Sequence, residues 1–152
     1  MQIEYKIVIA DTSCFILLDN IGELGLLKAL FGQVITTSVI AQEFGADLPE
    51  WVEIKLVSDK QFQSTLDVDA GEASAIALAL ESGPSLVILD DDKARKLAKK
   101  LNLNITGSLG VLLRAKREGI IPSIKPIIEK IQQTNFRYSQ KVLAEILLLA
   151  KE

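Results

Sequence analysis

Two short apolar runs of this sequence lead directly into acidic residues. Residues 7–10 are followed by Asp11, and residues 85–89 are followed by Asp90, Asp91 and Asp92. Short runs of Val, Ile and Leu predict strands that are buried on both faces, as in a parallel sheet. Ligands bind at the carboxyl ends of such strands, so acids in these two places indicate chemistry at one edge of the sheet.

The rest of the chain alternates predicted strands with predicted helices. Further strands are expected at residues 33–36, 51–57 and 104–106. Helices are expected at residues 13–19, 23–31, 39–44, 70–82, 93–101, 109–118, 125–133 and 140–150, whereas residues 58–67 are a polar stretch without a predicted helix. This alternation predicts an α/β fold of three layers, α/β/α, around a central, mostly parallel five-stranded sheet. We expect a single domain over residues 1–152, with a helical tail from about residue 122.

The chain contains no histidine among its 152 residues. This excludes catalytic triads that use histidine, imidazole bases and zinc sites with histidine ligands. An enzyme of this composition has to rely on carboxylates, lysines, hydroxyls or a metal ion bound by oxygen. Carboxylate ligands suit hard cations such as Mg²⁺ or Mn²⁺. The single cysteine, Cys14, is expected to be a small buried hydrophobe.

Charge is distributed unevenly along the chain. Residues 1–92 hold 4 Lys or Arg against 16 Asp or Glu, whereas residues 93–152 hold 13 against 4. Such asymmetry is typical of an acidic site beside a basic binding face. Lys93, Lys96 and Lys100 share one face of a predicted helix at spacings of three and four residues, so they can form a stripe that holds a phosphate backbone. A merely solvated helix surface would show the same pattern.

Each candidate acid also has a purely structural interpretation. Asp11 could simply cap the following helix, Glu43 could be a solvated helical charge, and Glu72 has the spacing of a capping box with Asp69. Three consecutive aspartates after the strand at 85–89 exceed what a cap requires, and their mutual repulsion calls for a positive group nearby. Because Asp11 and Asp90 both follow buried strands, a cluster is favoured over two separate caps.

Taken together, these motifs resemble the PIN-domain family, and within it the short prokaryotic proteins related to VapC-type toxin nucleases. The resemblance covers nearly the whole chain: a strand ending in Asp-Thr-Ser at 11–13, a glutamate in the helix after the second strand, an acid that opens an alanine-rich helix, and a strand that ends in acids. It implies that Asp11, Glu43, Glu72 and Asp90 are catalytic acids and metal ligands. It further implies Asp92 as an additional ligand, with Thr12, Ser13 and Asp91 as auxiliary residues.

The resemblance implies an activity and partners as well. Proteins of this family resemble endonucleases that cut single-stranded RNA with one or two Mg²⁺ or Mn²⁺ ions held by acids. A toxin of this kind would have an antitoxin protein as partner, and PIN domains of this size are commonly homodimers. The apolar excess of residues 15–18 and 146–149 also favours a homodimer.

Two alternatives remain at this level. A PIN scaffold could serve as an RNA-binding or assembly module in which the acids persist without productive metal binding. An acidic pocket of another α/β class, a receiver domain or a phosphatase of the haloacid dehalogenase type, is disfavoured. Ser13 stands where the phosphatase would have its second aspartate, and the acidic pair that a receiver needs at its first strand is missing.

No apolar run approaches the length of about 18 residues that a membrane span requires, and the first residues lack the layout of a signal peptide. We therefore expect a cytoplasmic protein without a membrane partner.

Overall fold

A computed structural model describes residues 5–152, so residues 1–4 of the predicted domain lie outside the described residues. Five strands form one sheet in the order β3-β2-β1-β4-β5, and every pair of neighbours is parallel. The strands are β1 (Val8–Ala10), β2 (Val34–Thr37), β3 (Val52–Lys55), β4 (Leu86–Ile88) and β5 (Asn104–Thr106). The predicted three-layer architecture with a central five-stranded sheet is confirmed, with β3 at one edge.

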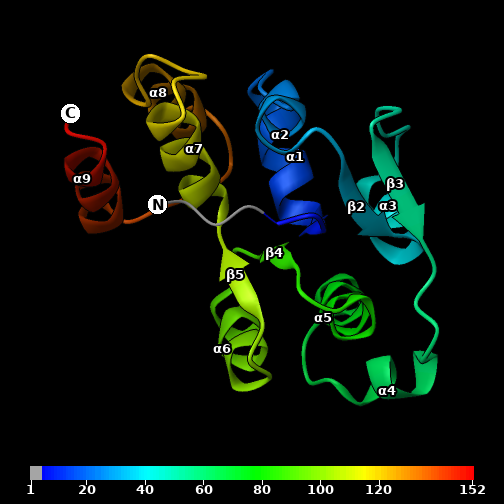
Figure 1. Cartoon of the computed structure of the whole chain (residues 1–152). Coiled ribbons are helices and arrows are strands. Elements are labelled where there is room, and N and C mark those ends of the chain that lie inside the picture. Colours follow the sequence, from blue (N-terminus) through cyan, green and yellow to red (C-terminus); the bar gives the residue numbers. More distant parts are fainter. Residues whose placement is uncertain (1–4) are drawn as a thin grey trace.

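Helices cover both faces of this sheet (Figure 1). They are α1 (Thr12–Asn20), α2 (Gly25–Phe31), α3 (Ser38–Phe44), α4 (Lys60–Thr65), α5 (Ala70–Ser82), α6 (Asp92–Lys100), α7 (Ser108–Arg117), α8 (Lys125–Gln132) and α9 (Gln140–Leu149). In the view of Figure 1, α5 and α6 lie below the sheet, while α1, α2 and α7 lie above it. No helix within residues 5–152 is both long and apolar enough to cross a membrane.

One helix was missed by the sequence analysis. Residues 58–67, expected to be a polar stretch without a helix, contain α4, whose first turn is capped by Asp59 through the N–H of Phe62 at 2.9 Å. The carboxylate of Glu81, in α5, accepts the N–H groups of Ser58 and Asp59. Helix α4 buries no residue, so its sequence lacks the apolar stripe from which a helix is predicted.

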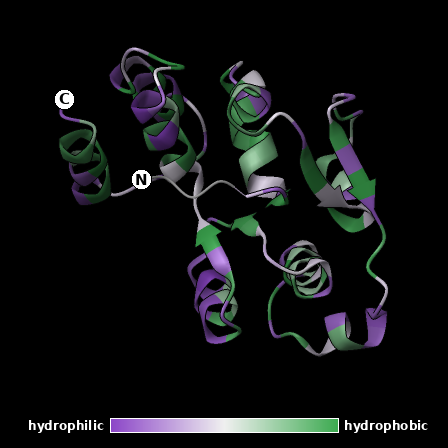
Figure 2. Ribbon diagram, in the orientation of Figure 1, coloured by the Kyte–Doolittle hydropathy of each residue, from purple (hydrophilic) through white to green (hydrophobic). Residues whose placement is uncertain are grey.

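The core lies between the sheet and the inner sides of the helices. All residues of β1 and β4 are buried, which explains why both strands are continuous apolar runs. Figure 2 shows the contrast with α6, which is mostly hydrophilic. Helix α5 buries eight of its thirteen residues, and four of the eight are alanines whose small side chains allow close packing on the sheet. Cys14 is buried, as expected.

The tail is attached through the side chain of Glu152. Its Oε2 accepts the N–H of Ile124 at 2.8 Å and the ammonium of Lys116 at 3.0 Å, and its Oε1 accepts the hydroxyl of Ser123. Lys116 also donates to the carbonyl of Ala150 at 2.6 Å. These contacts join the end of α9 to α7 and to the segment before α8.

Candidate active site

Asp11 follows β1 and occupies the N-cap position of α1, but its side chain makes no capping hydrogen bond. The residue is only 5% exposed. Burial raises the pKa of Asp11 from 3.8 to about 7; the backbone N–H of Thr12 opposes this shift, and the charges of Asp69, Glu43 and Asp90 add to it. A simple helix cap is therefore not the role of this carboxylate.

The next two residues of α1 each hold another acid. Thr12 Oγ1 donates to Glu43 Oε1 at 2.8 Å, and Ser13 Oγ donates to Asp90 Oδ2 at 3.2 Å. Thr12 and Ser13, predicted as auxiliary residues, therefore contact Glu43 and Asp90 through their hydroxyls. Three consecutive residues thus supply one acid and fix the positions of two more, which come from segments 31 and 77 residues away along the chain.

Glu43 is positioned by the packing of α3 against α5. The hydroxyl of Thr37 caps α3 by accepting the N–H of Ile40 at 3.1 Å, and it lies 2.7 Å from the hydroxyl of Ser74 in α5. The carboxylate of Glu43 lies directly over the Cα of Gly71, because a Cβ built at Gly71 would collide with Glu43 Oε1. The start of α5 and the end of α3 therefore meet at this carboxylate.

Glu72 takes part in the predicted capping box and also faces the other acids. Its Oε2 accepts the N–H of Asp69 at 3.3 Å, while Asp69 Oδ1 accepts the N–H of Glu72 at 2.9 Å. Burial and then the charges of Asp69, Asp91 and Asp11 raise the pKa of Glu72 to about 7. The structural and electrostatic roles of Glu72 therefore coexist.

The three consecutive aspartates have three different environments. Asp90 accepts the N–H of Ser108 at 2.7 Å through Oδ1 and the hydroxyl of Ser108 at 2.6 Å through Oδ2. Asp91 caps α6 by accepting the N–H of Ala94 at 2.9 Å. Asp92 is exposed in the first turn of α6. Of the three aspartates, only Asp90 accepts a hydrogen bond from the first turn of α1, through Ser13.

Several residues around these acids were missed by the sequence analysis. Asp69 was assigned only to a cap, yet its charge acts on both Asp11 and Glu72. Ser108 follows β5, so the rule that selected Asp11 and Asp90 could have found it. Tyr138 comes from the segment between α8 and α9, and no local motif marks it.

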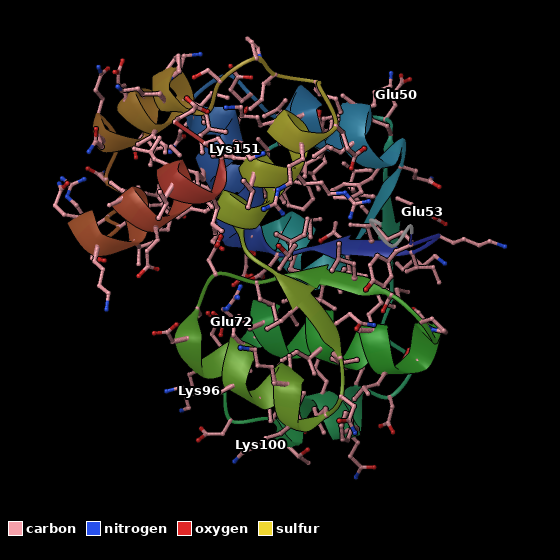
Figure 3. The ribbon with its side chains drawn as sticks, turned by 60° about the vertical axis from the view of Figure 1, so that its left-hand side comes forward. Glu50, Glu53, Glu72, Lys96, Lys100 and Lys151 are labelled. Atoms are coloured by element: carbon pink, nitrogen blue, oxygen red, sulfur yellow. The ribbon has the colours of Figure 1, made fainter. Side chains whose placement is uncertain are left out.

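The predicted lysine stripe lies on the outer side of α6. Lys93, Lys96 and Lys100 are all exposed, and Lys93 forms a 3.1 Å ion pair with Asp67 in which the two side chains are 65% and 95% exposed. Such an exposed pair contributes little and leaves Lys93 accessible. In Figure 3, Lys96 and Lys100 lie below Glu72, at the outside of the molecule.

The donor set fits a hard divalent cation in its chemistry. It consists of carboxylate and hydroxyl oxygens, and mutual repulsion between acids is the kind of energy that a bound cation relieves. Within residues 5–152, no three acidic or cysteine side chains are already arranged to hold a metal ion. The carboxylates of Glu43, Glu72 and Asp90 are instead engaged with protein donors.

The protein is thus a parallel α/β domain with Asp11 and Asp90 beyond the carboxyl ends of β1 and β4. A family model described as a PIN domain matches residues 7–152, and the chain belongs to this family. PIN domains are generally nucleases, and such nucleases typically use divalent metals. No curated protein and no solved structure matches the chain.

Proposed function

We propose that this protein is a metal-dependent endoribonuclease that cleaves single-stranded RNA. The observation that carries the proposal is the arrangement of residues 11–13, in which Asp11 is one acid while Thr12 and Ser13 hold Glu43 and Asp90 beside it. A set of carboxylates collected from three segments of the chain, two of them at the carboxyl ends of β1 and β4, is suited to hold a divalent cation beside a phosphodiester.

In this proposal, Asp11, Glu43, Glu72 and Asp90 hold Mg²⁺ or Mn²⁺, with Asp92 as a further ligand from the first turn of α6. A cation held by these residues would lower the pKa of a water molecule and would offset negative charge on the phosphate. Ser13 and Ser108 fix the orientation of Asp90, and Thr12 fixes that of Glu43. Asp91 is auxiliary, because its cap determines where α6 begins.

The RNA backbone is proposed to lie along Lys93, Lys96 and Lys100. These side chains are exposed and follow the acids directly in the chain. Contacts of this kind hold phosphates without reading sequence, so they fit a nuclease that approaches its substrate through the backbone.

The direct test compares wild type with the variant Asp11→Asn. We expect cleavage of single-stranded RNA in Mn²⁺ to fall at least about 100-fold, because removing a ligand should cost more than removing an outer partner. Mn²⁺ binding measured by calorimetry should weaken in parallel, while circular dichroism should show an unchanged fold. Undiminished cleavage by the variant would overturn the proposal.

A second candidate is a PIN scaffold that binds RNA or assembles without cleaving. It is favoured by the hydrogen bonds that already occupy Glu43, Glu72 and Asp90. Titration with Mn²⁺ separates the two candidates, since the scaffold would bind RNA equally well with and without the ion and would show no saturable metal site.

We further propose that the nuclease acts as the toxin of a toxin–antitoxin pair, supported by family membership and by the resemblance to VapC-type proteins. Expression of the wild-type chain in a bacterial host should then arrest growth, whereas Asp11→Asn should not. A small DNA-binding protein encoded next to this chain should restore growth when it is expressed together with it.

A further inference from the structure

A hollow of about 390 Å³ is lined in part by Asp90. Its walls come from the start of α6, from the β5–α7 connection and from the segment that leads into α9, and they include Asp92, Arg95, Leu109 and Tyr138. The volume lies within the range of about 300–1,000 Å³ that is usual for small-molecule sites. We call this hollow the Tyr138 pocket.

Tyr138 provides an aromatic wall with an uncommitted polar end. The residue is half-buried, and no group within residues 5–152 forms a hydrogen bond with its hydroxyl. Burial and the charge of Asp90 both raise the pKa of the Tyr138 hydroxyl, so this side chain lies near the acids. Leu109 and Val142 add apolar surface to the same pocket. An aromatic ring flanked by aliphatic side chains is the surface on which a nucleic-acid base stacks.

Arg95 provides a fixed cation at the other side of the pocket. Its Nη1 donates to the carbonyl of Leu89 at 2.8 Å, which holds the guanidinium beside the end of β4. No carboxylate in the described residues lies within ion-pair distance of Arg95. Its remaining N–H groups are therefore available, and a guanidinium is well suited to a phosphate.

Gly107 keeps Arg95 and Asp90 in contact with the pocket. A Cβ at Gly107 would lie 3.0 Å from Arg95 Nη1 and 3.0 Å from Asp90 Oδ1. Any side chain here would push between the cation and the acid. The absence of a side chain therefore leaves a continuous path from the Tyr138 pocket to the carboxylate of Asp90.

We propose that the Tyr138 pocket holds one unstacked nucleotide next to the phosphate that is cleaved, with its base on Tyr138 and a neighbouring backbone phosphate on Arg95. The proposal rests on the nuclease function proposed above and names its substrate subsite. A base that is paired in a duplex is stacked on both sides and cannot enter such a pocket. The pocket thus gives a physical reason for selection of single strands.

The test uses Asp11→Asn as a cleavage-silent background and a single-stranded oligoribonucleotide that carries 2-aminopurine at successive positions. Stacking on Tyr138 should quench the fluorescence at one position only. Adding Tyr138→Leu should abolish this quench and raise the Kd about 5- to 150-fold, the range expected for loss of one stacked base. The variant Tyr138→Phe should retain the fluorescence quench and the Kd of the parent. A duplex of equal length should bind at least about tenfold more weakly.

Two further variants sharpen the interpretation. Phe62→Leu removes a partly exposed aromatic ring on α4, outside the pocket, and should leave the Kd unchanged. Arg95→Gln should weaken binding and reduce the slope of log K against log salt by about 1, as expected for loss of one phosphate contact. Because Arg95 is not in the core, this variant tests the pocket even if Tyr138→Leu unfolds.

The outcomes separate this inference from the nuclease function. If Asp11→Asn abolishes cleavage but Tyr138→Leu and Arg95→Gln bind RNA as tightly as their parent, the pocket proposal is wrong and the nuclease proposal stands. If Asp11→Asn cleaves RNA like wild type, the nuclease proposal is wrong, whatever the pocket variants show. An unquenched probe at every position in the folded parent would also overturn the pocket.

Discussion

Gly71, in the first turn of α5, lies directly beneath the carboxylate of Glu43. A Cβ at this position would collide with Glu43 Oε1 and lie 3.0 Å from its Cδ. Because the colliding atoms are the end of a flexible side chain, Gly71→Ala should displace Glu43 without breaking the fold. Alanine also favours helices by up to about 1 kcal/mol over glycine, so stability should hold or rise.

The expected result for Gly71→Ala is therefore a loss of cleavage, about tenfold or more, with an unchanged or higher Tm. Thermal unfolding and RNA cleavage in Mn²⁺ measure the two effects on the same preparation. Gly25→Ala is the matched control, because nothing lies within 4 Å of a Cβ built there. Full activity of Gly71→Ala would mean that the position of Glu43 does not matter for the reaction.

The buried charge of Asp11 should make the metal-free protein less stable as the pH rises. The pKa of Asp11 is about 7 in the folded chain against 3.8 ordinarily, so between these values the folded state binds more protons than the unfolded state. Stability conferred by this group is complete below about pH 4 and is lost as the pH rises through 7. Glu72, whose pKa is also about 7, acts in the same direction.

Asp11→Asn should accordingly stabilise the protein in EDTA at pH 8, by roughly 1–4 kcal/mol, and have little effect at pH 4. Urea unfolding of both proteins at the two pH values measures this. Equal stabilities at pH 8 would show that the carboxylate is adequately solvated or compensated in the folded state.

Reversal of charge on the outer face of α6 should weaken RNA binding without affecting the acids. The double variant Lys96→Glu, Lys100→Glu should raise the Kd for every sequence tested and reduce the slope of log K against log salt by about 2. The affinity for Mn²⁺ should stay nearly unchanged. Lys55→Glu with Lys60→Glu is the control, since both lysines are exposed on β3 and α4. A wild-type salt slope in the α6 variant would mean that RNA approaches from another side.

The expected homodimer now depends on the tail alone. Phe15, Leu17 and Leu18, which contributed to the expectation, are fully buried in the core, whereas Leu148 and Leu149 are 76% and 56% exposed. Light scattering at tens of micromolar should give a dimer for wild type and a monomer for Leu148→Glu, Leu149→Glu. Leu56→Glu, at a residue that is 67% exposed near β3, should remain dimeric. A wild-type monomer would refute the expectation.

The sequence was sufficient to predict the sheet, because buried parallel strands and the helices between them have distinct periodicities. It also placed Asp11 and Asp90 at one edge, since strand polarity alone determines this. The differing environments of Asp90, Asp91 and Asp92 could not be predicted, because they depend on Ser108 and on where α6 begins. The position of Tyr138 could not be predicted for a similar reason, because its proximity to Asp90 depends on how the tail packs.

The attachment of the tail by Glu152 bears on the pocket that Tyr138 helps to form. Hydrogen bonds of Lys116 and Glu152 attach the end of α9 to α7 and to the segment before α8, and the start of α9 supplies Val142 to the pocket. Because α9 contributes to the pocket, we expect order in α9 and occupation of the pocket to be linked equilibria, each favouring the other by the same factor. Amide exchange in α9 should therefore slow when a nucleotide is bound, so exchange rates in the tail would measure binding in the pocket beside Asp90.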